Sequence, residues 1–399
     1  MSLLLLLTLA GCARPVDPLA AQREALTLAL EAPLPDGWAP HASLVVRQSV
    51  VEGVVLEALS RAMAVAVAPV EQSFFGLTAS MTPTVSVTSA RMSAGEGCEG
   101  CLSVTLALEG GAEMALENPT GRREQRVDWT GEASGTVLLR LDEDGRRVVA
   151  EIADPKSWRA SVDFAQVPGG WNSAISSALS AGLQAQVGRP SLPAIPLVRL
   201  EDDPRARLKG LRVRTAEVGV VVDFAFALAS AGAVVDLQAP PAEADWAVVV
   251  PAATALGMLR TAALSQPFTS DAPVVPELAG LSLEDGFVLD VLAWPTRGRG
   301  GAREVTVYGD VALVDGDVNV SVARAELVEQ EGVLPDLAAL LYGDRVLGEL
   351  ADAMSLTVPG ARTQSVGGVA LSGRTSSVST ADGALVLSGE FEVSAEGEH

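Results

Sequence analysis

The sequence predicts an α+β fold in which a curved antiparallel β-sheet rolls around two amphipathic helices, and this unit is made twice in tandem. Three observations support this fold class. Many segments alternate apolar and polar residues with period two, which is typical of antiparallel strands with one buried face. Four other segments carry apolar residues at helical spacing. The segments recur in the same order in both halves of the 399-residue chain, at a spacing too long for a solenoid repeat.

The first residues resemble the leader of a bacterial lipoprotein. A leucine-rich run ends in Leu9-Ala10-Gly11-Cys12, which is similar to the lipobox where such leaders are cleaved and the cysteine is acylated. The resemblance implies a signal peptide over residues 1–11, lipidation of Cys12 and a membrane partner through this acyl anchor. Ala13 resembles the residue found there in lipoproteins sorted to the bacterial outer membrane, which would leave the folded part in the periplasm. The leader lacks a basic residue after Met1, and the alternative is the start of a buried helix.

Residues 12–40 are expected to form a tether between this anchor and the folded body. The segment holds five prolines and several charges, so it favours extended chain with at most a short helical turn near 22–30. Such a tether would let the body stand off the membrane.

Each predicted unit begins with a strand that runs into a helix, at 43–63 and again at 246–263. A second helix follows at 171–184 or 335–354 and leads through a proline-containing exit into a further strand. The apolar stripe of each helix should face the sheet, where it either fills a core or lines a cavity. The candidate residues for contact with an apolar ligand lie on these stripes and on one strand: Val51, Val54, Val55, Ala58, Leu59, Trp171, Ile175, Leu179, Val220, Val222, Leu256, Leu259, Leu340 and Leu347.

The strands are predicted by clean alternation. It is seen at 102–108, 137–141, 220–226, 305–313, 318–322 and 385–393. Asp-Gly pairs at 144–145, 315–316 and 382–383 predict tight hairpins between successive strands.

Two domains are expected, an N-terminal barrel over residues 41–238 and a C-terminal barrel over residues 239–399. The boundary is placed at Ala239-Pro240-Pro241. Residues 188–200 are rich in proline and should form a stiff, extended crossing within the first domain.

Cys98 and Cys101 lie in a C-x-x-C spacing within a glycine-rich acidic loop. In an oxidising compartment this spacing favours a small local disulfide. A redox centre would need a nearby cation or a helix N-terminus, and a zinc site would need further ligands. The chain offers two histidines, His41 and His399. We therefore expect a structural disulfide, no metal site and no cofactor.

The formal net charge of −22 disfavours nucleic acid as a partner, because an acidic protein repels phosphate backbones. The sequence motifs of serine hydrolases, P-loop nucleotidases and zinc metalloproteases do not occur. The sequence therefore does not predict an enzyme.

Two segments resemble the tubular lipid-binding superfamily that contains the bactericidal/permeability-increasing proteins. These are Ala244-Asp245-Trp246-Ala247-Val248-Val249-Val250-Pro251 leading into its helix, and the stretch 175–197 with Leu192-Pro193-Ala194-Ile195-Pro196-Leu197. The likeness covers nearly all of the chain after residue 40. It implies two elongated half-barrels joined by a central sheet, with tubular apolar cavities for lipid or acyl-chain ligands. Two features depart from the family: the strong acidity, and the lack of a match for the disulfide of the animal members.

Two functions from different classes follow. The first is an envelope lipoprotein that binds or shuttles lipids in apolar cavities. The alternative is a non-catalytic structural or protein-interaction lipoprotein whose barrels are dry.

Overall fold

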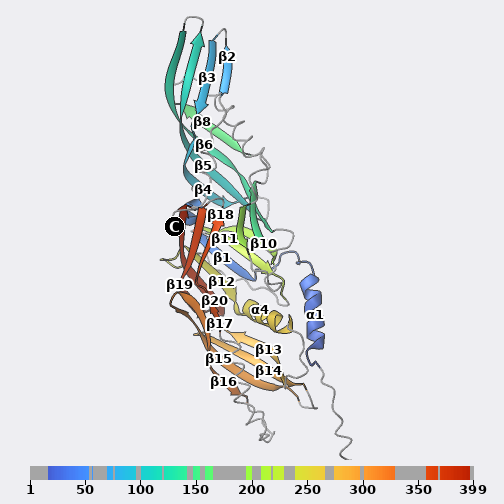
Figure 1. Cartoon of the computed structure of the whole chain (residues 1–399). Coiled ribbons are helices and arrows are strands. Elements are labelled where there is room, and N and C mark those ends of the chain that lie inside the picture. The colour runs from blue at the N-terminus through green and yellow to red at the C-terminus, as the bar shows by residue number, and fades with distance from the viewer. Residues whose placement is uncertain are drawn as a thin grey trace, which may run out of the picture.

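In the computed structural model, the described strands form three antiparallel sheets that follow one another along an elongated molecule (Figure 1). The structure describes residues 17–53, 56, 70–74, 77–95, 100–118, 121–141, 147–152, 158–164, 195–199, 208–216, 219–228, 239–265, 274–296, 301–328, 356–366 and 369–395. The described residues are mostly β-strand with few helices, and they include a sheet that curls as a half-barrel.

The N-terminal sheet is eight-stranded, with the order β2-β3-β5-β6-β7-β9, while β4 pairs with β5 and β8 pairs with β6. Its strands are β2 (Val70–Phe74), β3 (Leu77–Pro83), β4 (Ser86–Ala94), β5 (Cys101–Asn118), β6 (Gly121–Leu141), β7 (Arg147–Ile152), β8 (Arg159–Phe164) and β9 (Ile195–Arg199).

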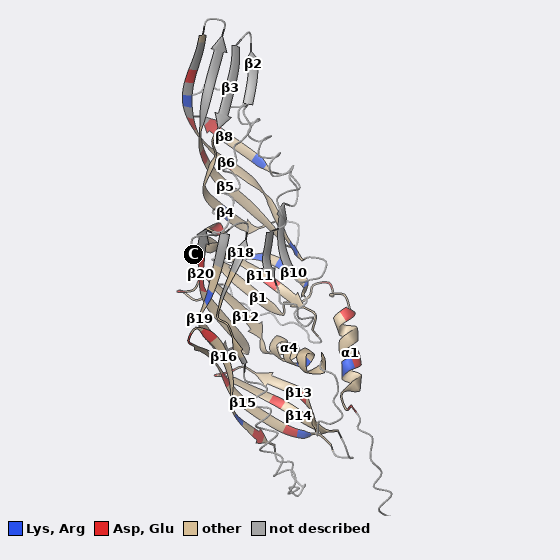
Figure 2. Ribbon diagram, viewed as in Figure 1, with Lys and Arg blue, Asp and Glu red and all other residues tan. Residues whose placement is uncertain are grey.

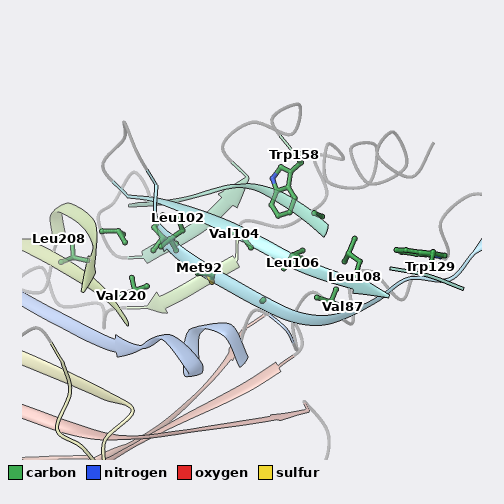
Figure 3. Packing of buried hydrophobic residues seen from close by; sticks show 14 residues of the cluster. Val87, Met92, Leu102, Val104, Leu106, Leu108, Trp129, Trp158, Leu208 and Val220 are labelled. Carbon is green, nitrogen blue, oxygen red and sulfur yellow. The ribbon is translucent and has the colours of Figure 1, made fainter. Parts of the chain in front are cut away.

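The two long strands β5 and β6 form one continuous antiparallel pair, from Cys101 opposite Leu138 to Asn118 opposite Gly121. Along β5 the side chains of four apolar residues are buried and point to one side of the sheet: Leu102, Val104, Leu106 and Leu108 (Figure 3). The residues between them are only half-buried. The period-two alternation predicted for this segment is thereby confirmed.

The C-terminal sheet is five-stranded, with the order β13-β14-β15-β16-β17. Its strands are β13 (Val274–Ser282), β14 (Phe287–Pro295), β15 (Arg303–Val314), β16 (Asp317–Leu327) and β17 (Leu356–Val358). Asp315 and Gly316 join β15 to β16 with φ of 54° and 89°, so both residues of the turn are left-handed. Two left-handed residues make a turn whose twist matches the twist of the flanking strands, which explains the Asp-Gly pair.

The central sheet lies between the other two and is seven-stranded, with the order β10-β11-β1-β12-β20-β19-β18. Its strands are β10 (Leu208–Ala216), β11 (Gly219–Phe226), β1 (Ala42–Arg47), β12 (Trp246–Pro251), β20 (Ala384–Ala395), β19 (Val369–Ala381) and β18 (Ala361–Val366). The hairpin predicted at 382–383 joins β19 to β20, with φ of 52° at Asp382 and 70° at Gly383.

Strands β1 and β12 are neighbours at the middle of this sheet, and each runs directly into a helix. Helical residues begin at Gln48 after β1, and α4 (Ala252–Ser265) follows β12. The transition from strand to helix is thus confirmed in both predicted units, while residues 54, 55 and 57–63 of the first predicted unit lie outside the described residues. The predicted second helices at 171–184 and 335–354 lie outside the described residues, as does the turn at 144–145. The repetition of a whole unit and the domain limits therefore stay predictions. The structure describes the proline-rich crossing only over β9, which is extended.

The N-terminal segment differs from the expected tether. Residues 20–31 form a helix, α1 (Ala20–Glu31), and Leu19 and Leu26 are buried. The segment 17–40 is thus packed on the body rather than standing off from it. The difference comes from tertiary contacts. Apolar side chains of this segment pack against residues far away in sequence, and the local composition does not reveal these contacts. Among the described helices, none is long and apolar enough to cross a membrane.

Candidate functional site

The face of the C-terminal sheet that packs against α4 is apolar. The fully or nearly fully buried residues of this face are Leu283, Phe287, Leu289, Val291, Val305 and Val307. Ala252 and Leu256 of α4 pack against them while remaining partly accessible. Alternation along β14 and β15 explains the face, because every second residue of each strand points to the same side.

Helix α4 has two different sides. Its buried residues are Thr254, Gly257 and Thr261, spaced three and four apart and therefore on one side of the helix. Ala252, Leu256 and Leu259 lie on the opposite side, at about 100° per residue. The predicted apolar stripe is thus not the most buried side of the helix. Its members remain partly accessible, and Leu259 is 41% exposed.

The two buried threonines of α4 differ in their hydrogen bonds. The Thr261 hydroxyl donates to the carbonyl oxygen of Gly257 at 2.7 Å. The Thr254 hydroxyl is fully buried and has no hydrogen-bond partner within the part of the chain that the structure describes. Sequence reasoning missed this side of α4, although its small residues at three- and four-residue spacing are a usable signal for close packing.

A second apolar interior lies under the N-terminal sheet (Figure 3). Val220, predicted to contact ligand, is buried there together with the leucines of β5. Val51 and Leu56 from the helix after β1, and Val222 from β11, pack against this cluster and are only partly buried. The structure therefore brings Val51, Val220 and Val222 to one cluster, and their contact with a ligand stays a prediction.

Several predicted site residues lie outside the described residues. They are Cys12, Val54, Val55, Ala58, Leu59, Cys98, Trp171, Ile175, Leu179, Leu340 and Leu347. Of the predicted cysteine pair, Cys101 is described: it is buried and disulfide-bonded. Its pairing with Cys98 stays a prediction.

A buried ionic network lies in the central sheet next to the N-terminal interior. The Asp223 carboxylate is fully buried and accepts hydrogen bonds from the Ser43 hydroxyl at 2.7 Å, from Arg214 at 3.1 Å and from Arg212 at 3.3 Å. The Arg212 guanidinium also lies 4.9 Å from the centre of the Trp38 ring. The network fixes β1, β10 and β11 to one another, because its members come from all three strands.

A polar cleft of about 590 Å³ opens on the N-terminal sheet and is lined in part by Glu109, Arg126, Asp128, Thr130 and Asp163. Sequence reasoning did not find it, because its residues come from several strands, among them β5, β6 and β8, whose pairing is not visible in the local sequence pattern. Within the described ranges, no group of three or more His, Cys, Asp or Glu side chains could hold a metal ion.

No protein-family model matches this sequence, and no curated protein matches it. Two solved structures are similar to the chain over most of its length. One is the crystal structure of lipopolysaccharide binding protein, with 11% identity and a TM-score of 0.39, covering 89% of this chain and 99% of the other. The other is the crystal structure of P47 of Clostridium botulinum E1, with 8% identity and a TM-score of 0.43, covering 89% of this chain and 100% of the other. Both likenesses are distant.

Proposed function

We propose that this chain is an envelope lipoprotein, anchored at the bacterial outer membrane through Cys12, that binds lipid acyl chains between its helices and its curved sheets. The folded part lies in the periplasm and shuttles or holds its ligand without catalysis. No cofactor takes part.

One observation carries the ligand proposal: the apolar side of α4 is left partly open above an apolar sheet face. A helix that only completes a core turns its largest apolar side chains inward. In α4 the small residues Thr254, Gly257 and Thr261 are buried, whereas Leu256 and Leu259 remain partly accessible. Leu256 packs on the apolar face, and Leu259 follows it on the same side of the helix, so the two leucines offer contacts that an acyl chain can complete.

The energy of such contacts is sufficient without a charged anchor. Each buried CH₂ contributes about 0.8 kcal/mol, so a chain of about a dozen carbons gains roughly 10 kcal/mol before the entropic cost of association. Apolar contact therefore fits a protein of net charge −22, which would repel an anionic headgroup at long range.

The dry alternative has its own support. Leu289 and Val307 under the C-terminal sheet, and Leu106 and Leu108 under the N-terminal sheet, are at most 1% exposed. Interiors with such buried side chains are also expected of a structural or interaction lipoprotein.

The deciding experiment is extraction of the purified protein with organic solvent, followed by mass spectrometry of the extract. Binding of a fluorescent fatty acid is then titrated. We expect co-purified lipid and saturable binding of the probe, and the Leu259→Asn variant should weaken this binding by about fivefold because an apolar contact is lost.

The matched control is Val314→Asn, since Val314 is exposed to a similar extent on β15 outside the proposed site. It should leave probe binding unchanged. Absence of both extracted lipid and probe binding would instead support dry barrels. The mass of the N-terminal peptide tests the anchor separately, and an unmodified Cys12 would exclude it.

A further inference from the structure

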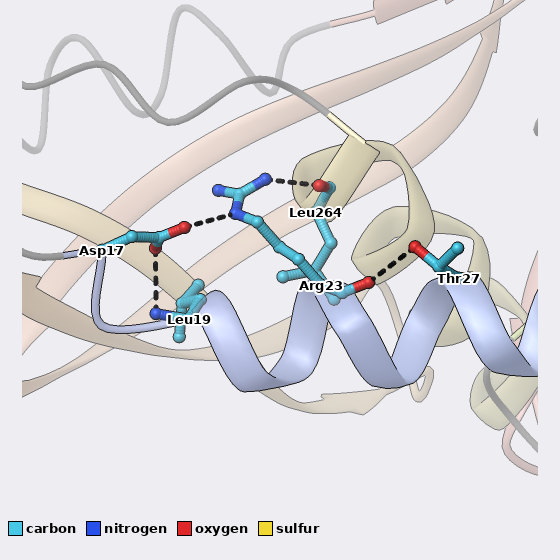
Figure 4. Close-up of polar contacts among 5 residues, drawn as sticks. All are labelled: Asp17, Leu19, Arg23, Thr27 and Leu264. Carbon is cyan, nitrogen blue, oxygen red and sulfur yellow. Dashed lines mark hydrogen bonds and ion pairs between the residues drawn. The ribbon is translucent and has the colours of Figure 1, made fainter.

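The N-terminal segment is fastened to the body at the very start of its described part (Figure 4). The Asp17 carboxylate accepts a hydrogen bond from the Leu19 backbone at 3.0 Å and pairs with Arg23 at 2.9 Å. The same guanidinium donates to the carbonyl oxygen of Leu264, near the end of α4. The beginning of the segment is thus fixed to α4 by a partly buried set of contacts.

Further contacts fasten α1 along its length. Gln22 donates to Glu277 of β13 at 2.6 Å, and Glu277 in turn accepts from the Trp294 indole of β14 at 2.6 Å. At the other end of α1, the Lys209 ammonium of β10 donates to the carbonyl oxygens of Ala29 at 2.9 Å and Ala32 at 2.5 Å. A cation at these carbonyls satisfies groups that a helix end leaves unpaired.

The docking of residues 17–40 shortens the reach of any anchor at Cys12. From Cys12 to Asp17 there are five peptide units, which span at most about 18 Å when fully extended. A free segment from Cys12 to Pro40 would span up to roughly 100 Å. The body therefore cannot stand far from a membrane that holds Cys12.

We propose that the surface formed by α1, together with the adjoining ends of α4 and β13, docks on the lipid bilayer that holds Cys12. This proposal rests on the anchor of the proposed function. The short reach places Asp17 beside the bilayer, and α1 begins three residues later. The α1 side chain Leu28 is 65% exposed, which suits contact with the membrane interface.

The position of α1 in the molecule also determines which part lies away from the bilayer. Strands β2 and β3 form the tip at one end of the molecule, whereas α1 lies beside α4 and β13 in the other half (Figure 1). The N-terminal sheet is therefore the part furthest from the anchor. Both charge signs occur on α1, with Arg23 beside Glu24 and Glu31 near its end (Figure 2). Docking then depends on reach and apolar contact rather than on attraction to anionic lipid.

The test is energy transfer from the protein to a rhodamine-labelled lipid in vesicles of phosphatidylethanolamine and phosphatidylglycerol. The acylated protein carries a fluorophore on a cysteine placed either at Thr27 of α1 or at Thr88 of β4, both exposed positions. We expect at least about twofold higher transfer from position 27 than from position 88, because the short anchor holds α1 close to the bilayer.

A second arm makes the test independent of acylation in cells. Hexahistidine replaces Cys12 in the mature chain, and the vesicles carry a nickel-chelating lipid. An insertion of 24 Gly and Ser residues after position 12 is the matched control, and it should remove most of the difference between the two labels because it restores a long reach. Equal transfer from both positions on the short anchor, or higher transfer from position 88, would overturn the docking surface. If Cys12 proves unmodified but transfer in this arm is still higher from position 27, only the proposed acyl anchor is wrong, and the docking surface stands.

Discussion

The indole of Trp158 lies directly over Gly135 of β6. A Cβ atom built on Gly135 would be 2.2 Å from two atoms of the ring, closer than any real contact. Both residues border the interior of the N-terminal sheet, where Trp158 is 7% exposed. The glycine thus provides the space in which the tryptophan closes this interior.

Gly135→Ala should therefore destabilise the fold. The added methyl forces Trp158 or the strand to move, and overpacking of this kind costs about 1–3 kcal/mol. Urea unfolding followed by tryptophan fluorescence measures the change in the free energy of unfolding. Gly301→Ala is the control, because a Cβ there meets nothing within 4 Å. If the two variants unfold at the same urea concentration, the packing of Trp158 does not need the space left by the missing side chain of Gly135.

Asp223→Asn should also lower the free energy of unfolding. The substitution preserves the shape of the side chain but removes the charge that Arg212 and Arg214 share. Hydrogen bonds to a charged group contribute about 1.5–3 kcal/mol each when buried. Both arginine side chains are 31% exposed, so solvent screening brings the expected loss to about 1–3 kcal/mol in total.

The surface pair of Arg126 and Asp128 supplies the comparison for this network. Its side chains are 75% and 84% exposed, and Asp128→Asn should change stability by less than about 0.5 kcal/mol. Urea unfolding at two salt concentrations measures both variants. A loss at Asp223 no larger than that at Asp128 would mean that the buried carboxylate does not hold the three strands together.

Thr254→Val should leave stability unchanged or raise it by about 1 kcal/mol, because it replaces a buried hydroxyl that has no partner in the described structure with a methyl of the same shape. Thr261→Val should instead destabilise by about 1 kcal/mol, since it removes the hydrogen bond to Gly257. Thermal unfolding of the two variants, with and without fatty acid, makes the comparison. A large loss at Thr254 would show that its hydroxyl is paired.

The strands, turns and helix starts that depend on a local pattern of residues could be predicted from the sequence. Alternation predicted the strand that carries Leu102 to Leu108, and the Asp-Gly pairs at 315–316 and 382–383 predicted two hairpins. The strand-to-helix transitions before Gln48 and Ala252 were predicted as well. Each of these depends on residues that are close together in the chain.

The parts that the sequence did not predict depend on contacts across the chain. Prolines suggested a free tether, but Arg23 binds the carbonyl of Leu264 and Lys209 binds the end of α1. The apolar stripe of α4 suggested its buried side, whereas Thr254 and Thr261 are buried instead. Close packing favours small residues whatever their polarity. The spacing of hydrophobic residues therefore does not predict which side of such a helix is buried.

The pairing of β1 with β12 joins parts of the chain that are about two hundred residues apart, from Ser43 opposite Val249 to Val46 opposite Trp246. A protease cut between Leu228 and Ala239 would leave this pairing intact, and the two fragments should stay bound to each other. Either fragment made by itself would present a bare strand edge with apolar Val45 or Ala247 on it, and such an edge recruits further copies. Co-expression, rather than separate production, is therefore the route by which a split version of this protein would reassemble.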